Sequence, residues 1–230
     1  MLKTYAGLNR SIYVLFIAQV VNSVGHFVHP FLTLFLTRKL GMGPLEAGFY
    51  VTLSALAWVP SSLAGGKIAD SFGRKKVLVL FHTLPAQVLI PCAFLGTSRI
   101  IAWLLIAASF LHGLAEPVND AVITDLSDAQ QRKAAFSLLY LGHNIGVAVG
   151  PLIAGLLFNR HLVWFFLGDA ATTLVAVVLI ALFVRESAPT REMVERSFTA
   201  GPSLERAEKG SLVTVLLRRP YLVAFLFIHV

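Results

Sequence analysis

The stretch GGKIADSFGRKK, from Gly65 to Lys76, has an unusual composition for this sequence. It holds four cations and one carboxylate, although only 13% of the 230 residues are charged. A phosphate-binding loop would need Ser or Thr directly after its Gly-Lys pair and a strand before it. Ile68 follows Lys67 here, and a long apolar run comes before the stretch. The sequence therefore excludes a phosphate-binding loop at this point.

Long apolar segments lie on both sides of this stretch. Hydrophobic residues make up 57% of the chain and its mean hydropathy is +0.76, whereas soluble domains are about 45–50% apolar. Apolar helices of roughly twenty residues can cross a bilayer core of about 30 Å, and the segments lack the alternation of barrel strands. We therefore expect an all-α membrane protein. Its six spans would be Ile12–Phe35, Ala47–Ala64, Val77–Gly96, Ile100–Ile123, Ala135–Phe158 and Leu162–Val184, with a seventh starting near Leu222.

The cations are distributed unevenly among the loops between these spans. If the N-terminus is cytoplasmic, fifteen of the nineteen Lys and Arg residues fall on the cytoplasmic side, and Arg38, Lys39, Arg99 and Arg160 fall outside. This positive-inside bias predicts a multi-pass protein of the cell membrane with a cytoplasmic N-terminus. It also accounts for the net charge of +7 without a nucleic-acid partner. Because Cys92 is the single cysteine, we expect neither a disulfide framework nor a metal cluster; we also expect no cofactor.

The order of segments suggests three parts. Residues 1–184 would form a six-helix transmembrane bundle, 185–219 a polar cytoplasmic linker, and 220–230 the truncated start of a second bundle. This order is typical of the first half of a duplicated transporter, whose two halves enclose a site near the middle of the membrane. We therefore expect the chain to be a fragment of a protein about twice as long.

In this topology, Gly65–Lys76 becomes the cytoplasmic turn between the second and third spans. Its spacing, G-x-x-x-D-x-x-G-R-K-K, resembles the signature loop of the major facilitator superfamily. The matching residues are Gly66, Asp70, Gly73, Arg74 and Lys75. The resemblance implies the N-terminal half of that fold. We expect Gly66 to allow close approach of a helix and Gly73 to adopt a positive φ.

The resemblance also implies partners for the charged residues of this loop. Asp70 would contact a helix of the second half, and Arg74 would lie near Asp125 at the end of the fourth span. Such pairs would hold one conformer and break in the other, which makes the loop a candidate gate. Arg132 follows Asp125 on the next cytoplasmic turn, at a spacing common in the superfamily. The alternative is an ordinary basic loop that serves only topology.

A second motif, GHNIGVAVGPLIAG, lies in the fifth predicted span. Glycines spaced by four residues share one helix face and permit close packing, and a proline can kink the helix. The motif resembles the fifth-helix motif of drug and metabolite exporters, which implies export rather than import. Its residues are Gly142, Gly146, Gly150, Pro151 and Gly155.

Ionisable residues inside the spans are candidate proton- and substrate-binding groups, because a charge in the bilayer is costly. His112, Glu116 and Asp120 recur every four residues and so share one helix face. Glu116 has no Lys or Arg near it in this half, so we expect it to carry a coupling proton. The resemblance implies an arginine where Ser109 stands, so coupling through that arginine is excluded. Further candidates are Asn22, His26, His29, His143, Asn144 and Asp169.

Less specific explanations remain for some of these residues. Asp120 is close enough to the cytoplasmic end of its span to be solvated. His26 and His29 are equally consistent with hydrogen-bonded packing histidines. The leading hypothesis is a secondary-active exporter of small amphiphilic molecules, driven by protons through alternating access. Its partners would be a small-molecule substrate, protons, the lipid bilayer and the C-terminal half.

Three other functions compete with this hypothesis. A proton-coupled nutrient importer would share the fold. A receptor or scaffold on the same fold would bind a ligand without moving it. A membrane-embedded enzyme is disfavoured because neither a nucleophile elbow nor an H-E-x-x-H motif is present. We therefore expect no catalytic residue.

Overall fold

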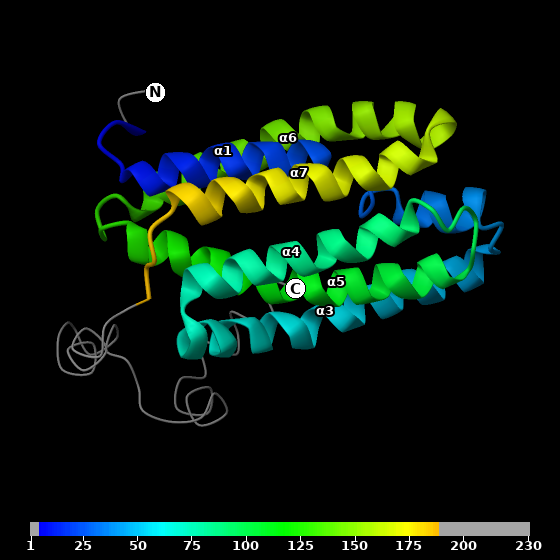
Figure 1. The fold of residues 1–230 in the computed structure, drawn as a ribbon, viewed down its shortest axis with the longest axis horizontal. Helices are drawn as coiled ribbons and strands as arrows, with labels where there is room; N and C mark the ends of the chain where they lie inside the picture. Colours follow the sequence, from blue (N-terminus) through cyan, green and yellow to red (C-terminus); the bar gives the residue numbers. More distant parts are fainter. Residues whose placement is uncertain (1–4, 189–230) are drawn as a thin grey trace. The chain divides into compact units, whose positions relative to one another are not determined.

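The computed structural model describes residues 5–188, which form a bundle of long helices (Figure 1). No strand occurs within these residues, so the predicted all-α fold class is confirmed. The helices are α1 (Arg10–Gly25), α2 (Leu32–Leu34), the π-helix η2 (Phe35–Lys39), α3 (Pro44–Phe72), α4 (Arg74–Cys92), α5 (Ile100–Leu126), α6 (Arg132–Arg160) and α7 (Leu162–Phe183).

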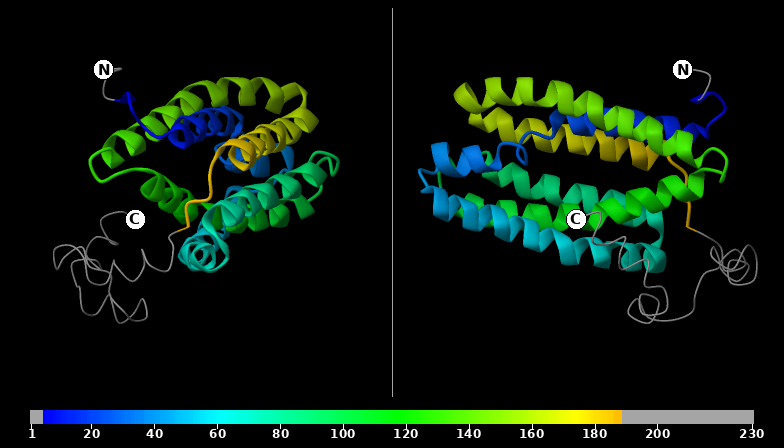
Figure 2. Two further views of the ribbon diagram at one scale, coloured as in Figure 1. Left: turned by 60° about the vertical axis from the view of Figure 1, so that its left-hand side comes forward. Right: turned by 180° about the vertical axis from the view of Figure 1, so that it is seen from behind.

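The long helices pack in two groups of three. α1 packs against α6 and α7, whereas α5 packs against α3 and α4, and the contact between α4 and α7 joins the two groups. Figure 2 shows both groups from two further directions. The chain therefore begins in one group, passes through the other and returns to the first.

The two ends of the bundle carry different residues. We call the end that holds the turn between α3 and α4 the basic end; it lies on the left of Figure 1. Lys67, the start of α4 and the start of α6 supply its cations. The opposite end, called the far end here, holds η2 and the turn between α6 and α7. Each end has its own apolar cluster, around Phe35 and Phe165 at the far end and around Leu78 and Val118 at the basic end.

Four helices within residues 5–188, namely α3, α5, α6 and α7, are long and apolar enough to cross a membrane. The other two predicted spans, the first and the third, differ from expectation. α4 has 19 residues and starts with three cations, so its apolar part is short. The seventh span and almost all of the linker 185–219 lie outside the described residues.

The prediction of one continuous first span at Ile12–Phe35 is wrong. α1 ends at Gly25, and regular helix resumes only at Leu32. Pro30 lies between these points; proline has no N–H to donate and disfavours helical conformation in the residue before it. A helix with a non-helical break, residues 26–31, therefore occupies this position.

The turn expected between Ala64 and Val77 is also much shorter than predicted. α3 continues to Phe72 and α4 begins at Arg74, so Gly73 alone separates the two helices. Gly73 has a φ of +95°, a conformation that favours glycine. Most of the motif is therefore helical, because α3 extends beyond its apolar part.

Candidate functional site

Polar side chains gather at mid-depth, between the two apolar clusters. α1 and the break after it supply four of them, and one comes from each of α4, α5, α6 and α7. We call this set the polar middle layer. Its members are Gln19, Asn22, Ser23, His26, His82, His112, His143 and Thr173.

Hydrogen bonds link α1 to its two neighbours within this layer. Thr173 Oγ1 of α7 donates to Asn22 Oδ1 at 2.9 Å. Gln19 Nε2 donates to Ser23 Oγ at 3.0 Å, and Ser23 Oγ lies 3.5 Å from Nδ1 of His143 on α6. Asn22 and His143 were predicted candidates; the structure joins Asn22 of α1 to α7, and His143 of α6 to α1.

Four imidazole rings lie in sequence across the bundle. The ring centroids of His29 and His26 are 5.6 Å apart, and those of His26 and His112 are 5.5 Å apart, both pairs stacked. His82 meets His112 edge-on at 6.2 Å. The structure thus brings three predicted histidines together and adds His82, which sequence reasoning missed. A histidine inside an apolar span was itself a signal that could have found it.

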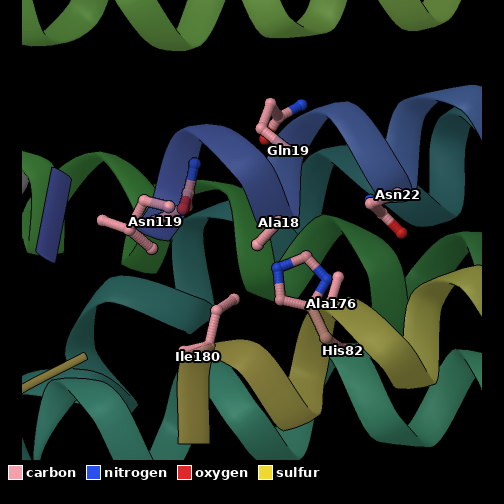
Figure 3. Close-up of a pocket in the computed structure, with 8 residues that line it drawn as sticks. Ala18, Gln19, Asn22, His82, Asn119, Ala176 and Ile180 are labelled. Atoms are coloured by element: carbon pink, nitrogen blue, oxygen red, sulfur yellow. The ribbon is translucent and has the colours of Figure 1, made fainter. Parts of the chain in front are cut away.

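A small cavity lies beside this row of rings (Figure 3). Its volume of about 20 Å³ is enough for one water molecule. Four polar side chains from three helices line it together with apolar ones, so a water there would have several hydrogen-bonding partners. The lining residues are Leu15, Ala18, Gln19, Asn22, His82, Asn119, Ala176 and Ile180.

Two carboxylates form an acidic face on α5. Glu116 and Asp120 are both exposed in the described part of the chain, and neither takes part in a salt bridge there. His112, one turn earlier, is only partly exposed because its ring lies among the other histidines. On α6, His143 and Asn144 are exposed as well, and Asn144 Nδ2 donates to the carbonyl of Tyr140.

Asp169 lies apart from the acidic face. Its side chain is buried, with 3% of the residue exposed, and it accepts two backbone hydrogen bonds from the break after α1. It was predicted as a proton- or substrate-binding candidate, but within residues 5–188 it contacts backbone rather than an open surface.

An ion-pair cluster marks the basic end. Arg74 Nη1 lies 2.8 Å from Asp125 Oδ2, and Arg74 Nη2 lies 3.4 Å from Asp70 Oδ1. The arginine side chain is only 15% exposed, whereas that of Asp70 is 65% exposed. The structure thus brings Arg74 and Asp125 together. The helix expected to contact Asp70 lies outside the described residues, and Arg132 is exposed at the start of α6.

Sequence reasoning missed one carboxylate at this end, that of Glu186. Its Oε1 accepts hydrogen bonds from the backbone N–H groups of Lys75, Ser187 and Ala188, at 3.1–3.2 Å. Partial burial alone would raise the pKa of Glu186, but the backbone donors outweigh burial and lower the pKa. The carboxylate also stands at the N-terminus of α4, where the helix dipole favours negative charge. An acidic residue directly after the sixth span was the available signal.

The glycines of the second motif lie against α1. A Cβ at Gly146 would overlap Ser23, and one at Gly150 would come within 2.9 Å of the carbonyl oxygen of Val24. A Cβ at Gly142 would lie 3.1 Å from the ring of Phe16, whereas a Cβ at Gly155 would meet only the ring of Phe31, at 4.0 Å. Close packing of α6 on α1 therefore depends on the first part of the motif. Pro151 lies inside α6.

Within the described part of the chain, the glycine that allows close approach of a helix is Gly65, the neighbour of Gly66. A Cβ at Gly66 would meet nothing within 4 Å there, while a Cβ at the neighbouring Gly65 would overlap the carbonyl oxygen of Leu114 on α5. Neighbouring residues on a helix point about 100° apart, so only one of the two can face α5. Close approach of α3 to α5 requires Gly65.

Apolar helices, polar groups at mid-depth and ion pairs at the two ends of the bundle are the features of a multi-pass membrane protein. The model of the Major Facilitator Superfamily matches residues 15–230. The chain belongs to this superfamily.

Individual relatives agree with this assignment. The chain is 30% identical to the multidrug resistance protein MdtH of Photorhabdus laumondii over 176 residues, which cover 75% of this chain and 43% of MdtH. It is 27% identical to a Na(+), Li(+), K(+)/H(+) antiporter of Planococcus maritimus, covering 78% and 43%. The crystal structure of the POT family transporter PepTSo superimposes with a TM-score of 0.64 at 18% identity, covering 94% and 47%. The chain thus spans about half the length of the proteins it matches.

Proposed function

We propose that this chain is the N-terminal half of a secondary-active exporter that moves small amphiphilic molecules out of the cell in exchange for protons. Membership of the superfamily supports transport, and the names of the antiporter and multidrug relatives support proton-coupled export. In such a transporter the two halves rock about a site at mid-depth, which opens alternately to either side.

The observation that carries this proposal is the acidic face of α5. Glu116 and Asp120 are one helical turn apart and exposed, with no cation paired to either within residues 5–188. Two carboxylates at this spacing repel each other when both are charged. One proton relieves that repulsion. We assign the coupling proton to Glu116 because it lies nearer to the polar middle layer, while Asp120 is one turn closer to the basic end.

The other candidate residues take supporting roles in this proposal. His26, His29, His112, His143, Asn22 and Asn144 would line the substrate cavity. The pair of Arg74 and Asp125 would hold one conformer and release in the other, because a state-dependent ion pair biases a two-state equilibrium. The glycines Gly142, Gly146 and Gly150 would let α6 slide against α1.

The proposal also includes a membrane location and a domain layout. The N-terminus and the basic end would lie in the cytoplasm of a cell-membrane protein, as the distribution of cations favours. Residues 1–184 would be the N-terminal bundle, 185–219 the linker between halves and 220–230 the start of the C-terminal bundle.

The test uses the full-length transporter in proteoliposomes, with ethidium as a cationic amphiphilic probe. Glu116→Gln keeps the shape of the side chain and removes its ability to release a proton. We expect efflux driven by a pH gradient to fall to the background rate, while ethidium binding persists. Glu46→Gln is the matched control, because Glu46 is at the far end and pairs with Arg99 at 2.7 Å.

Proton-driven flux in Glu116→Gln equal to that of the wild type would overturn the role of Glu116. A pH gradient that drives accumulation in the direction of proton flow would instead identify an importer. Binding of the probe without any gradient-dependent movement would identify a receptor.

A further inference from the structure

The break after α1 leaves backbone groups at mid-depth that the helix itself cannot satisfy. α1 ends at Gly25 and the next helical residue is Leu32. The N–H of Phe27 reaches the carbonyl of Gly25 at 2.8 Å, in a turn too tight to continue the helix. In a membrane, water cannot satisfy such groups, so protein must do so.

Asp169 of α7 supplies the acceptor. One oxygen, Oδ2, accepts the N–H of Phe27 at 3.0 Å and the N–H of Val28 at 2.9 Å. These two donors are 4% and 7% exposed, so the contact is closed to solvent. No salt bridge within residues 5–188 involves Asp169. The carboxylate therefore serves as hydrogen-bond acceptor for the backbone N–H groups of the break.

Two further residues of α7 hold α1 just before the break. A Cβ at Gly25 would overlap the side chain of Thr172, so α1 and α7 are in direct contact at this glycine. Thr173 donates its hydroxyl to Asn22. Asp169, Thr172 and Thr173 lie at i, i+3 and i+4, which places them on one face of α7. This face contacts the end of α1 and the start of the break together.

The break also carries two of the candidate cavity residues. His26 and His29 lie on either side of the two residues bound by Asp169, and their rings stack with each other. His26 stacks in turn on His112 of α5. A movement of Phe27 and Val28 would displace both rings from this row. The backbone contact with Asp169 thus determines where the histidines lie.

We propose that Asp169 is a positioning residue of the transport site, which fixes the break in the first membrane helix and so places His26 and His29 in the cavity wall. The carboxylate itself does not touch substrate. The hydrogen bonds from Phe27 and Val28 to Asp169 do not depend on the proposed function, whereas their importance for transport rests on it.

Hydrogen–deuterium exchange of the full-length transporter in nanodiscs tests this contact without a substrate. In the wild type, the amides of Phe27 and Val28 exchange more slowly than those of His29 and Phe31, for which no acceptor is found within residues 5–188. Asp169→Ala removes this acceptor, so exchange at Val28 becomes roughly tenfold faster. Exchange at Phe27 increases less, because its N–H also reaches the carbonyl of Gly25. Asp169→Asn keeps a carbonyl oxygen in place and gives a smaller increase.

Thr173→Val is the matched control. It removes the hydrogen bond to Asn22 from the same helix pair but leaves the acceptor for the break intact, so exchange at Phe27 and Val28 stays at the wild-type rate. Equal exchange rates for all four amides of the wild type would overturn the proposal even if Asp169→Ala fails to fold. An unchanged rate in folded Asp169→Ala would overturn it as well.

Ethidium efflux supplies the functional readout. Asp169→Ala raises the half-saturating ethidium concentration more than it lowers the maximal rate, and Asp169→Asn restores most of the difference. Equal effects of Asn and Ala on that concentration would refute the positioning role. If the wild type moves no ethidium, the proposed export function fails, while the exchange experiment still decides whether Asp169 fixes the break.

Discussion

At the scale of single residues, Arg74 is the residue that joins two carboxylates of the basic end. Its two terminal nitrogens point to different carboxylates, Asp125 and Asp70, while most of its side chain is covered. A planar guanidinium holds two acceptors in fixed directions, whereas the ammonium group of a lysine is a single point charge on a flexible stem. The resemblance to a family motif was enough to predict the pair with Asp125.

Removal of this arginine tests the gate. Arg74→Ala leaves Asp125 without its cation, which costs about 1–3 kcal/mol in the conformer that contains the pair. We expect the maximal rate of ethidium efflux from proteoliposomes to fall by roughly 5- to 160-fold, as such an energy implies, with little change in half-saturation. Lys76→Ala removes the same charge from an exposed position nearby and should leave efflux unchanged. Equal efflux by wild type and Arg74→Ala would contradict the gate.

Glu186 gives a prediction about pH. Because the folded state lowers the pKa of Glu186 below its ordinary value of 4.5, the carboxylate stabilises the fold above pH 4.5, where it is charged in both states. This contribution disappears as the pH falls through the lowered pKa. We therefore expect Glu186→Gln to melt at a lower temperature than wild type at neutral pH, and the difference to vanish in strong acid.

The measurement is thermal melting of the detergent-solubilised full-length protein at a series of pH values. A difference between the two proteins that grows on acidification would show the opposite sign. The same scan on Glu46→Gln controls for general effects of acid, since Glu46 pairs with Arg99 at the far end instead of a helix terminus.

At the scale of elements, the contact between α3 and α5 depends on a single glycine. Gly65→Ala forces a methyl group into the backbone of Leu114, whereas Gly66→Ala adds a methyl group where nothing lies within 4 Å in the described part of the chain. Overpacking of this kind costs about 1–3 kcal/mol.

We expect Gly65→Ala to lower the melting temperature of the full-length transporter, and Gly66→Ala to leave it unchanged or slightly higher, because alanine favours helix. Size-exclusion chromatography after heating measures both variants. The reverse order would mean that Gly66 faces a partner beyond residue 188.

Sequence reasoning succeeds for elements where composition alone decides the outcome. Apolar runs located α5, α6 and α7 to within a few residues, and the motif predicted the positive φ of Gly73, the residue that separates α3 from α4. Sequence reasoning failed for the break at residues 26–31, because mean hydropathy does not record backbone geometry. It also could not predict the contacts of His82, Asp169 and Glu186, since their partners are distant in sequence and depend on how the helices pack.

At the scale of the whole molecule, the cations are distributed between the two ends of the bundle. Arg38, Lys39, Arg99 and Arg160 lie at the far end, and the Lys and Arg residues around Gly73 and at the start of α6 lie at the basic end. The same distribution predicts the orientation in the membrane.

Labelling of single cysteines tests this orientation in whole cells. Cys92 is buried, so it gives little background. We expect Arg160→Cys to react with a membrane-impermeant maleimide in intact cells, and Lys76→Cys to react only after permeabilisation. Both positions are exposed in the described part of the chain. Labelling of Lys76→Cys in intact cells would reverse the proposed topology.

The route of the chain through its two groups of helices also has a consequence for biosynthesis. Phe27 and Asp169 are 142 residues apart, which at about 5–20 residues per second corresponds to roughly 7–28 s of translation. α3, α4 and α5 are consecutive and can assemble during this interval. α1 must wait in the bilayer, with its broken end unsatisfied, until the ribosome delivers α7. The hydrogen bonds between Asp169 and the break can therefore form only late in synthesis, after helices α1 to α6 have been made.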